Sequence, residues 1–201
     1  GLTITGLLAA MVLVGQLWTP YDPTAMSAGE KFLAPCLAHP FGTDNFGRDI
    51  FSRVMKGAGT TFSIALMTVS IGAVLGTLAG ALTGYFGGIV DETLMRLNDA
   101  LTAFPSILLA MVVIAITGRG TYNVIAALGI LFIPSFARLV RGEFIKYRDR
   151  DFVQSARLAG VPAWRIIFVH ILPNTWPVLL SGLTIGFNNA VLSEASMSFL
   201  G

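Results

Sequence analysis

The chain has 201 residues, of which 54% are hydrophobic and only 12% are charged. A soluble domain carries about 25% charged residues, so this chain has too little polar surface for a protein that is dissolved in water. The net charge of +2 is too small to indicate nucleic-acid binding, and the single cysteine, Cys36, excludes an internal disulfide and a cysteine-based metal site.

An apolar segment opens the chain. Residues 2–18 come close to the roughly 20 residues of a membrane span. No small-x-small cleavage site follows them, as it would after a signal peptide, because the sequence continues Leu17-Trp18-Thr19-Pro20. We therefore expect residues 1–18 to form a retained transmembrane helix that ends before Pro20.

Residues 19–57 are polar and rich in turns, which indicates a loop outside the hydrocarbon layer. In its second half, Gly42-Thr43 has the composition of a helix start. Two acid–base pairs follow with the i, i+4 spacing of a helix and the acid first: Asp44/Arg48 and Asp49/Arg53. The pattern predicts a short helix that lies along the membrane surface and leads into the next span.

The next stretch, residues 57–90, carries no charge and is long enough for one tilted helix and a turn. Within it, glycine recurs every four residues on one helical face: Gly72, Gly76, Gly80 and Gly84. Such a face would weaken a helix in water, but in lipid it lets two helix backbones approach closely. We therefore expect helix packing at these glycines, and a flexible gating helix is the weaker alternative.

Two further spans are expected between residues 91 and 137. A charged turn at the membrane edge comes first and contains Asp91, Glu92, Arg96 and Asp99. An uncharged span then covers residues 100–118, with Pro105 near its start, and a tight turn of Gly118-Arg119-Gly120 follows it. The fourth span is expected at residues 121–137.

Basic residues are concentrated after the fourth span. Seven of the thirteen Lys and Arg residues lie there: Arg138, Arg141, Lys146, Arg148, Arg150, Arg157 and Arg165. This concentration places the loop in the cytoplasm by the positive-inside rule. No formal charge follows from Ile166 until Glu194, so the fifth span is expected at about residues 176–193. Counting back puts Gly1 inside, the 19–57 loop outside and Gly201 outside.

Residues 151–173 are amphipathic within an otherwise apolar chain. A first helix is predicted with one face of Phe152, Val153, Ala156 and Ala159. Gly160 can end this helix in the left-handed conformation, and Pro162 can start a new one. The second helix has the spacing i, i+3, i+4, i+7: Trp164, Ile167, Phe168 and Ile171.

Pro173 is expected to break the second helix. Two short helices joined at a Gly-x-Pro corner predict a docking surface, with the small residues Ser155, Ala156 and Ala159 facing a groove of another protein. A hairpin on the membrane surface without a partner is the alternative.

This stretch resembles the cytoplasmic Glu-Ala-Ala loop in the permeases of binding-protein-dependent ABC importers. The family pattern is Glu-Ala-Ala, a glycine four residues after the last alanine, and then Ile-x-Leu-Pro. The chain has Gln154-Ser155-Ala156, Gly160 and His170-Ile171-Leu172-Pro173, and a histidine there resembles the dipeptide, oligopeptide and nickel branch. The resemblance implies that a loop at about residues 142–173 couples the chain to ATPase subunits through Gln154, Ser155, Ala156, Arg157, Ala159, Gly160, His170 and Pro173.

Other segments resemble the same branch. The string Gly-Thr-Asp-x-x-Gly-Arg-Asp-x-x-Ser-Arg of the extracytoplasmic loop is present as Gly42, Thr43, Asp44, Gly47, Arg48, Asp49, Ser52 and Arg53. A structural role for these residues, orienting the start of the helix, is favoured over contact with substrate. Residues 94–105 and 198–201 also resemble the branch, so the resemblance covers essentially the whole chain.

The resemblance implies an all-α, polytopic membrane protein with the type I ABC importer permease fold. Five transmembrane helices are expected in this chain, and the family core of six has its last helix beyond Gly201, which fits a fragment. The expected parts are a first transmembrane helix at 1–18, an extracytoplasmic loop with a surface helix at 19–57, and a permease core at 58–201.

The same resemblance implies a function and partners. The chain would be the second, C-type permease, paired with a homologous permease in the inner membrane of a bacterium or archaeon. Two ATPase subunits would bind ATP and Mg, an extracytoplasmic protein would bind the solute, and this subunit would hold no cofactor. Di- or oligopeptides are the preferred solute, since no cluster of His, Cys or Met suggests metal handling. Nickel or another small solute is the alternative.

No residue pattern indicates catalysis. A glycine-rich phosphate loop and a histidine pair at metal spacing are both absent from the sequence, and His39 is expected to be a surface histidine. Candidates to line the pathway are Asn188, Asn189 and Glu194. Hydrogen bonding between helices explains the two asparagines equally well.

Two other classes of membrane protein are weaker alternatives. An ion-coupled carrier usually places ionisable residues in mid-membrane, where only Glu194 is a candidate. A structural scaffold would leave the three ordered motifs unexplained.

Overall fold

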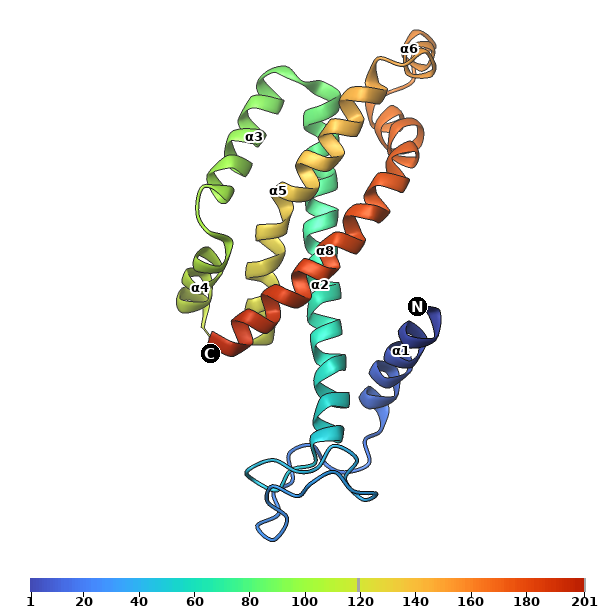
Figure 1. Ribbon diagram of the computed structural model, residues 1–201. Helices are drawn as coiled ribbons and strands as arrows, with labels where there is room; N and C mark the ends of the chain where they lie inside the picture. Colours follow the sequence, from blue (N-terminus) through green and yellow to red (C-terminus); the bar gives the residue numbers. More distant parts are fainter. Residues whose placement is uncertain (119, 201) are drawn as a thin grey trace. The chain divides into compact units, whose positions relative to one another are not determined.

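The computed structural model describes residues 1–118 and 120–200, so Arg119 of the expected turn lies outside the described residues. The helices are α1 (Leu2–Leu17), α2 (Ile50–Phe86), α3 (Gly88–Thr102), α4 (Ser106–Thr117), α5 (Thr121–Arg148), α6 (Asp151–Leu158), α7 (Ala163–Arg165), the π-helix η1 (Ile166–Ile171) and α8 (Leu172–Leu200). The described part of the chain contains no strand, which confirms the all-α class. It divides into two compact units, Gly1–Ser63 and Ile64–Gly201 (Figure 1).

The first unit contains α1, the loop after it and the first turns of α2. A Cβ atom at Gly15 of α1 would lie 2.6 Å from the carbonyl oxygen of Met55, so the missing side chain lets α1 and α2 touch backbone to backbone. The predicted surface helix is wrong, because residues 43–49 form a loop and the helix begins at Ile50. Glycines with positive φ at Gly42 and Gly47 explain this, since such residues turn the chain rather than continue a helix.

In the second unit, the glycine repeat of α2 packs against α5. A Cβ atom at each of the four glycines would lie 2.5 Å from an atom of α5; the atoms belong to Phe132, Phe136, Ala137 and Phe144. Real Cβ atoms do not approach that closely, so the two backbones are in contact only because glycine stands there. The structure therefore places the repeat in a helix–helix interface.

A second small-residue interface, on α8, was not anticipated from the sequence. A Cβ atom at Gly182 would lie 2.5 Å from Leu139, and one at Gly186 would lie 3.1 Å from Phe136. The five residues Gly-Leu-Thr-Ile-Gly have the GxxxG spacing of close helix pairs in membranes. Helix α5 thus packs against both α2 and α8, and its Phe136 belongs to the buried core of the unit.

Helices α3 and α4 are bent by 87° relative to each other at a short break. The predicted charged turn is wrong, because its acidic and basic residues lie within α3. Two of the acids hold α3 against α5: both carboxylate oxygens of Asp91 accept from Arg141, at 2.5 and 2.6 Å, and Asp99 accepts from Arg138 at 2.8 Å. The span expected at 100–118 is not a single helix, since Pro105 lies in the break between α3 and α4.

By length and composition, fewer helices qualify as membrane spans than the five that the sequence suggested. Three described helical stretches are long and apolar enough to cross a membrane: Ile50–Phe86, Thr121–Arg148 and Ala163–Phe199. The bent pair α3–α4 makes a fourth if it is counted as one span. Helix α1 is apolar but has only 16 residues. The chain is thus a helical membrane protein with three or four candidate spans.

Candidate functional site

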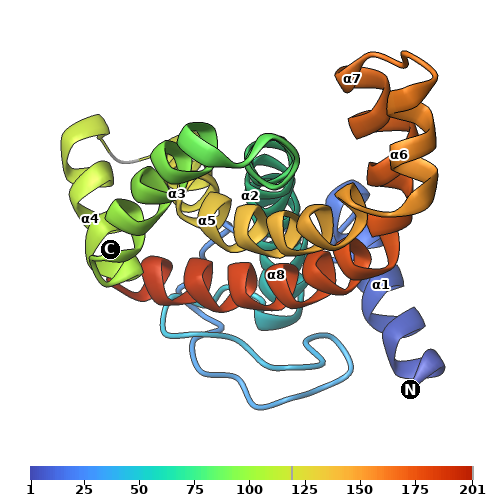
Figure 2. The same cartoon turned by 90° about the horizontal axis from the view of Figure 1, so that it is seen from above.

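Helices α6 and α7 form the helix–corner–helix unit that the sequence predicted. Helix α6 ends in a Schellman motif: Gly160 donates to the carbonyl of Arg157 and Val161 donates to that of Ala156, both at 3.0 Å. Gly160 has φ +77°, which a side chain would resist. Pro162 then precedes α7 as its N-cap. The two helices project from one end of the second unit (Figure 2).

The outward face of α6 differs from the one expected. Ala156 is only 9% exposed, and with Val153 it packs into the core of the second unit. The assignment of Ala156 to a docking face is therefore wrong. Val153 and Ala156 are three residues apart, so they share the inward side of this short helix. The exposed residues of the motif are Gln154, Ser155, Arg157, Leu158, Ala159 and Gly160.

The second half of the predicted hairpin is a π-helix rather than an α-helix. In η1, Leu172 donates to the carbonyl of Ile167, five residues back. This wider turn buries the neighbours Ile166 and Ile167 together with Ile171, and it leaves Phe168 exposed. The predicted common face of Trp164, Ile167, Phe168 and Ile171 is wrong, because Trp164 and Phe168 are exposed while Ile167 and Ile171 are buried. The prediction assumed an α-helical period.

Pro173 does not end the helix as predicted. It lies in the first turn of α8, which continues directly from η1. A proline lacks the N–H that the preceding turn would accept, and the side chain of Asn174 satisfies one carbonyl there by donating to His170 at 2.6 Å. His170 is half-buried, and its Nδ1 lies 3.2 Å from the carbonyl oxygen of Arg165.

Helix α6 is tied to the ends of α2 and α5. The guanidinium carbon of Arg157 lies 4.9 Å from the ring centre of Tyr85 at the end of α2. The rings of Phe152 and Tyr147 lie 6.5 Å apart. These contacts join the exposed helix to two long helices of the second unit.

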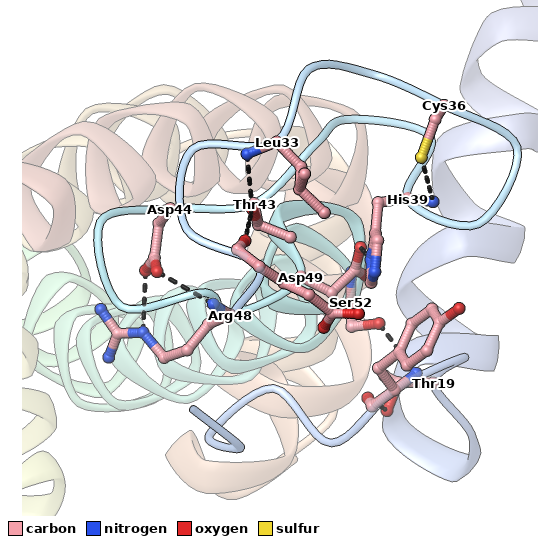
Figure 3. A network of polar contacts seen from close by, with 11 residues as sticks. Thr19, Leu33, Cys36, His39, Thr43, Asp44, Arg48, Asp49 and Ser52 are labelled. Carbon is pink, nitrogen blue, oxygen red and sulfur yellow. Dashed lines mark hydrogen bonds and ion pairs between the residues drawn. The ribbon is translucent and has the colours of Figure 1, made fainter. Parts of the chain in front are cut away.

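A second candidate site, in the first unit, is a polar network in the loop between α1 and α2 (Figure 3). His39 Nδ1 lies 2.9 Å from Asp49 Oδ1, Asp49 Oδ2 accepts the N–H of Ser52 at 2.8 Å, and Ser52 Oγ accepts the N–H of Tyr21 at 3.1 Å. His39 is only 6% exposed, so the expectation of a surface histidine is wrong. The sequence did not indicate this pairing, because Asp49 is ten residues away from His39 in a loop. The network joins three distant parts of the loop.

Asp44 organises the neighbouring turn. It accepts from the N–H groups of Phe46 and Arg48 and from Arg48 Nε at 2.8 Å, and it also pairs with Arg53. The predicted Asp44/Arg48 pair is confirmed, but Arg53 pairs with Asp44 rather than with Asp49. Burial alone would raise the pKa of Asp44, but the hydrogen bonds from Arg48 and Phe46 and the charge of Arg48 lower it to about 2.

Thr43 closes the loop from the other side. Its hydroxyl donates to the carbonyl of Glu30 and accepts the N–H of Leu33 at 2.9 Å. The pKa of Asp49 is lowered, because hydrogen bonds from Ser52 and His39 outweigh its burial. The conspicuous residues of this string are thus engaged in bonds within the loop, as expected for a structural role.

The expected pathway residues differ in their surroundings. Asn188 and Asn189 are exposed on α8, while Glu194 is half-buried. Asn189 lines a cavity of about 490 Å³ together with residues of α3, α4 and α5, and Glu194 lines another of about 510 Å³. Asn188 lines neither cavity. Across residues 1–118 and 120–200, no three His, Cys, Asp or Glu side chains are grouped as metal ligands.

Comparison with known proteins shows what kind of protein carries this geometry. Residues 72–201 match the family described as binding-protein-dependent transport system inner membrane component. The dipeptide transport system permease protein DppC of Alkalihalophilus pseudofirmus is 36% identical over 201 residues, which are 100% of this chain and 66% of the relative.

Two further bacterial relatives are similar over nearly the whole chain. The glutathione transport system permease protein GsiD of Pectobacterium atrosepticum is 39% identical over 97% of this chain and 65% of its own length. The probable D,D-dipeptide transport system permease protein DdpC of Escherichia coli is 35% identical over 100% of this chain and 69% of its own length. The chain thus spans about two thirds of these relatives. It belongs to the family of binding-protein-dependent transport system inner membrane components, which are transport proteins rather than enzymes.

Proposed function

We propose that this chain is the C-type permease subunit of an ABC importer for di- or oligopeptides. The names of the three relatives support this, because each is a permease protein of a transport system for a dipeptide, a D,D-dipeptide or glutathione. Their shared peptide chemistry favours a peptide over nickel. The subunit holds no cofactor itself; it forms the path with a homologous permease and receives solute from an extracytoplasmic binding protein.

The observation that carries the proposal is the exposed surface of α6 and α7. Leu158 is 89% exposed and Trp164 is 58% exposed, although both are large and apolar. Exposed apolar residues on this corner, with Arg157 and Arg165 beside them, are typical of a protein-binding surface. The partner would be an ATPase subunit, and two such subunits would bind ATP and Mg.

The proposed permease crosses the membrane five times within this chain, at least one crossing more than the three or four helical stretches that qualify as spans by length and composition. If α1, α2, the bent pair α3–α4, α5 and α8 each cross the membrane once, then α6 and the start of α1 both lie on the cytoplasmic side. The loop between α1 and α2 and the end of α8 are then extracytoplasmic. Helix α1 is only about 24 Å long at 1.5 Å per residue, so local thinning of the bilayer would accompany it.

Coupling would then be mechanical. Closure of the two ATPase subunits on ATP moves the α6–α7 corner, and the core contacts of Val153 and Ala156 transmit this movement to α5 and α8. The solute path opens alternately to the two sides of the membrane. The chain itself needs to supply only a docking surface and a path.

Cross-linking in the assembled transporter tests the docking surface. In a Cys36→Ser background, Leu158→Cys and Trp164→Cys should cross-link to an ATPase subunit with a bifunctional thiol-to-amine reagent. Tyr122→Cys is the matched control, because Tyr122 is 82% exposed at the start of α5, at the other end of the second unit (Figure 1). Cross-links from Tyr122→Cys but from neither corner position would refute the proposed docking surface.

A further inference from the structure

The end of α8 lies opposite α6 in the second unit (Figures 1 and 2), and Glu194 near this end lines a cavity. It has a volume of about 510 Å³, and its walls come from α4, the start of α5 and the end of α8, with Ile64 of α2. Pockets for small ligands range from about 300 to 1,000 Å³, so a dipeptide-sized group fits. Most of the wall is apolar, and Met111, Ile114 and Val124 contribute to it.

Glu194 faces the interior of the unit rather than lipid. On α8 it lies between Ala190, which is fully buried, and Met197, which is 7% exposed, at the spacing i, i+4, i+7. Met197 packs with Ala110 and Leu128 in a small buried cluster. The carboxylate is therefore held on the packed side of the helix, at the cavity wall.

The carboxylate has no opposite charge beside it in the described part of the chain. Glu194 is absent from all ion pairs and hydrogen bonds that the structure contains over residues 1–118 and 120–200. It is also the only charged residue that lines the cavity among those described. A carboxylate in a largely apolar wall is unfavourable unless a cation pairs with it.

We propose that Glu194 makes this cavity a binding site for the cationic group of the transported solute, namely the free α-ammonium of a peptide. An ammonium has three donors. The carboxylate of Glu194 and the hydroxyl groups of Thr121 and Ser198, which also line the cavity, are acceptors for them. The inference rests on the proposed function for its ligand, because a peptide supplies the ammonium, but the charge preference of the cavity is independent of it.

The rim of the cavity is held in place by Asn123. Its side-chain amide donates to the carbonyls of Thr117 and Gly118, at 3.0 and 2.9 Å. These two bonds fix the end of α4 against the start of α5. The acceptor hydroxyl of Thr121 is thereby held near the mouth, where an incoming solute from the extracytoplasmic side would arrive.

A first experiment measures the charge preference without any solute. Thr121 is exposed, so Thr121→Cys in the Cys36→Ser background of the assembled transporter gives one thiolate at the mouth. It attacks a methanethiosulfonate reagent, forms a mixed disulfide and releases methanesulfinate. The rates are compared for a trimethylammonium and a sulfonate reagent. A unit charge acting over about 7 Å changes each rate roughly three-fold even at the dielectric constant of water.

Adding Glu194→Gln should therefore lower the cation-to-anion rate ratio roughly seven-fold, the product of the two effects. Glu194→Asp should keep most of the ratio. Glu92→Gln is the matched control, because Glu92 is an exposed glutamate of α3 that pairs with Arg96 outside the cavity. A ratio that is the same with Glu194 and with Gln at this position would overturn the proposed cation site.

A second experiment identifies the ligand. Uptake of a dipeptide is compared with uptake of its N-acetylated form, with each rate divided by the occupancy of the binding protein. The wild-type transporter should prefer the free amine, and Glu194→Gln should lose that preference while Glu92→Gln keeps it. An unchanged preference in Glu194→Gln would overturn the assignment to the ammonium. If no peptide is taken up while the reagent ratio still depends on Glu194, the proposed function fails and the cation site stands.

Discussion

Arg157 of α6 lies over the ring of Tyr85 at the end of α2, with 4.9 Å between the guanidinium carbon and the ring centre. Arg157 belongs to the exposed corner, whereas Tyr85 packs against the core of the second unit. The contact therefore joins a residue on the surface proposed for the ATPase to a helix that crosses the membrane. It is a direct route by which movement of the corner can reach α2.

Replacing Tyr85 tests this route. Tyr85→Leu removes a cation–π contact worth about 0.5–2 kcal/mol, so we expect fewer peptides imported per ATP hydrolysed. Tyr85→Phe keeps the aromatic face and should behave as the wild type. The ratio of uptake to hydrolysis in proteoliposomes is the measurement. Equal ratios in the leucine and phenylalanine variants would show that the contact does not transmit coupling.

Ala156 and Ser155 are neighbours with opposite surroundings, which gives a second prediction. Ala156→Asp places a carboxylate in the core beside Val153, so it should destabilise the subunit by several kcal/mol and lower the yield of folded permease. Ser155 is exposed, so Ser155→Asp should fold normally. Thermal unfolding of the purified complexes is the measurement, and equal melting temperatures would contradict the buried position of Ala156.

The contrast between these two residues shows the limit of the sequence for the candidate site. The Gly-x-Pro corner could be predicted, because Gly160 and Pro162 act through backbone geometry that is local to the chain. Which side of α6 faces inward depends on the core that α5 and η1 provide, and the sequence of α6 alone does not contain that information. The π-turn of η1 could not be predicted for the same reason.

The glycine face of α2 leads to a third prediction. A Cβ atom at Gly80 would lie 2.5 Å from the carbonyl oxygen of Ala137 and 2.9 Å from the N of Arg141, both backbone atoms that cannot move aside. Gly80→Ala should therefore separate α2 from α5 and destabilise the second unit. Gly142→Ala is the control, because nothing lies within 4 Å of a Cβ atom there. If both variants were equally stable in thermal unfolding, the close contact would be refuted.

For α2, the sequence alone could predict a close contact with another helix, but it could not predict that this helix is α5. The period of four glycines predicts a close backbone contact, and it does not name the partner. The loop of the first unit was less accessible. Positive φ at Gly42 and Gly47 turns the chain where the charge pattern suggested a helix, and pairing of His39 with Asp49 depends on that turn.

The loop between α1 and α2 gives a prediction about pH. The pKa of Asp44 falls from a model-peptide value of about 4 to about 2 in the folded loop, so the unfolded state binds the proton more tightly. The stabilisation is complete above about pH 4 and is lost as the pH falls towards 2. The protection factors of the loop amides, which correct the exchange rate for the intrinsic rate at each pH, should therefore fall below pH 4. Asp44→Asn should remove the part of this acid sensitivity that comes from Asp44. A wild-type loop whose protection does not change in acid would contradict the role of Asp44.

The most direct test of the account is uptake of a dipeptide into proteoliposomes that contain the full-length permease, its homologous partner, two ATPase subunits and the binding protein. We predict uptake that requires both ATP and the binding protein and that Gly160→Val abolishes, since a β-branched residue resists the positive φ of the corner. Uptake that an ion gradient drives without ATP, or that persists unchanged in Gly160→Val, would contradict the central claim.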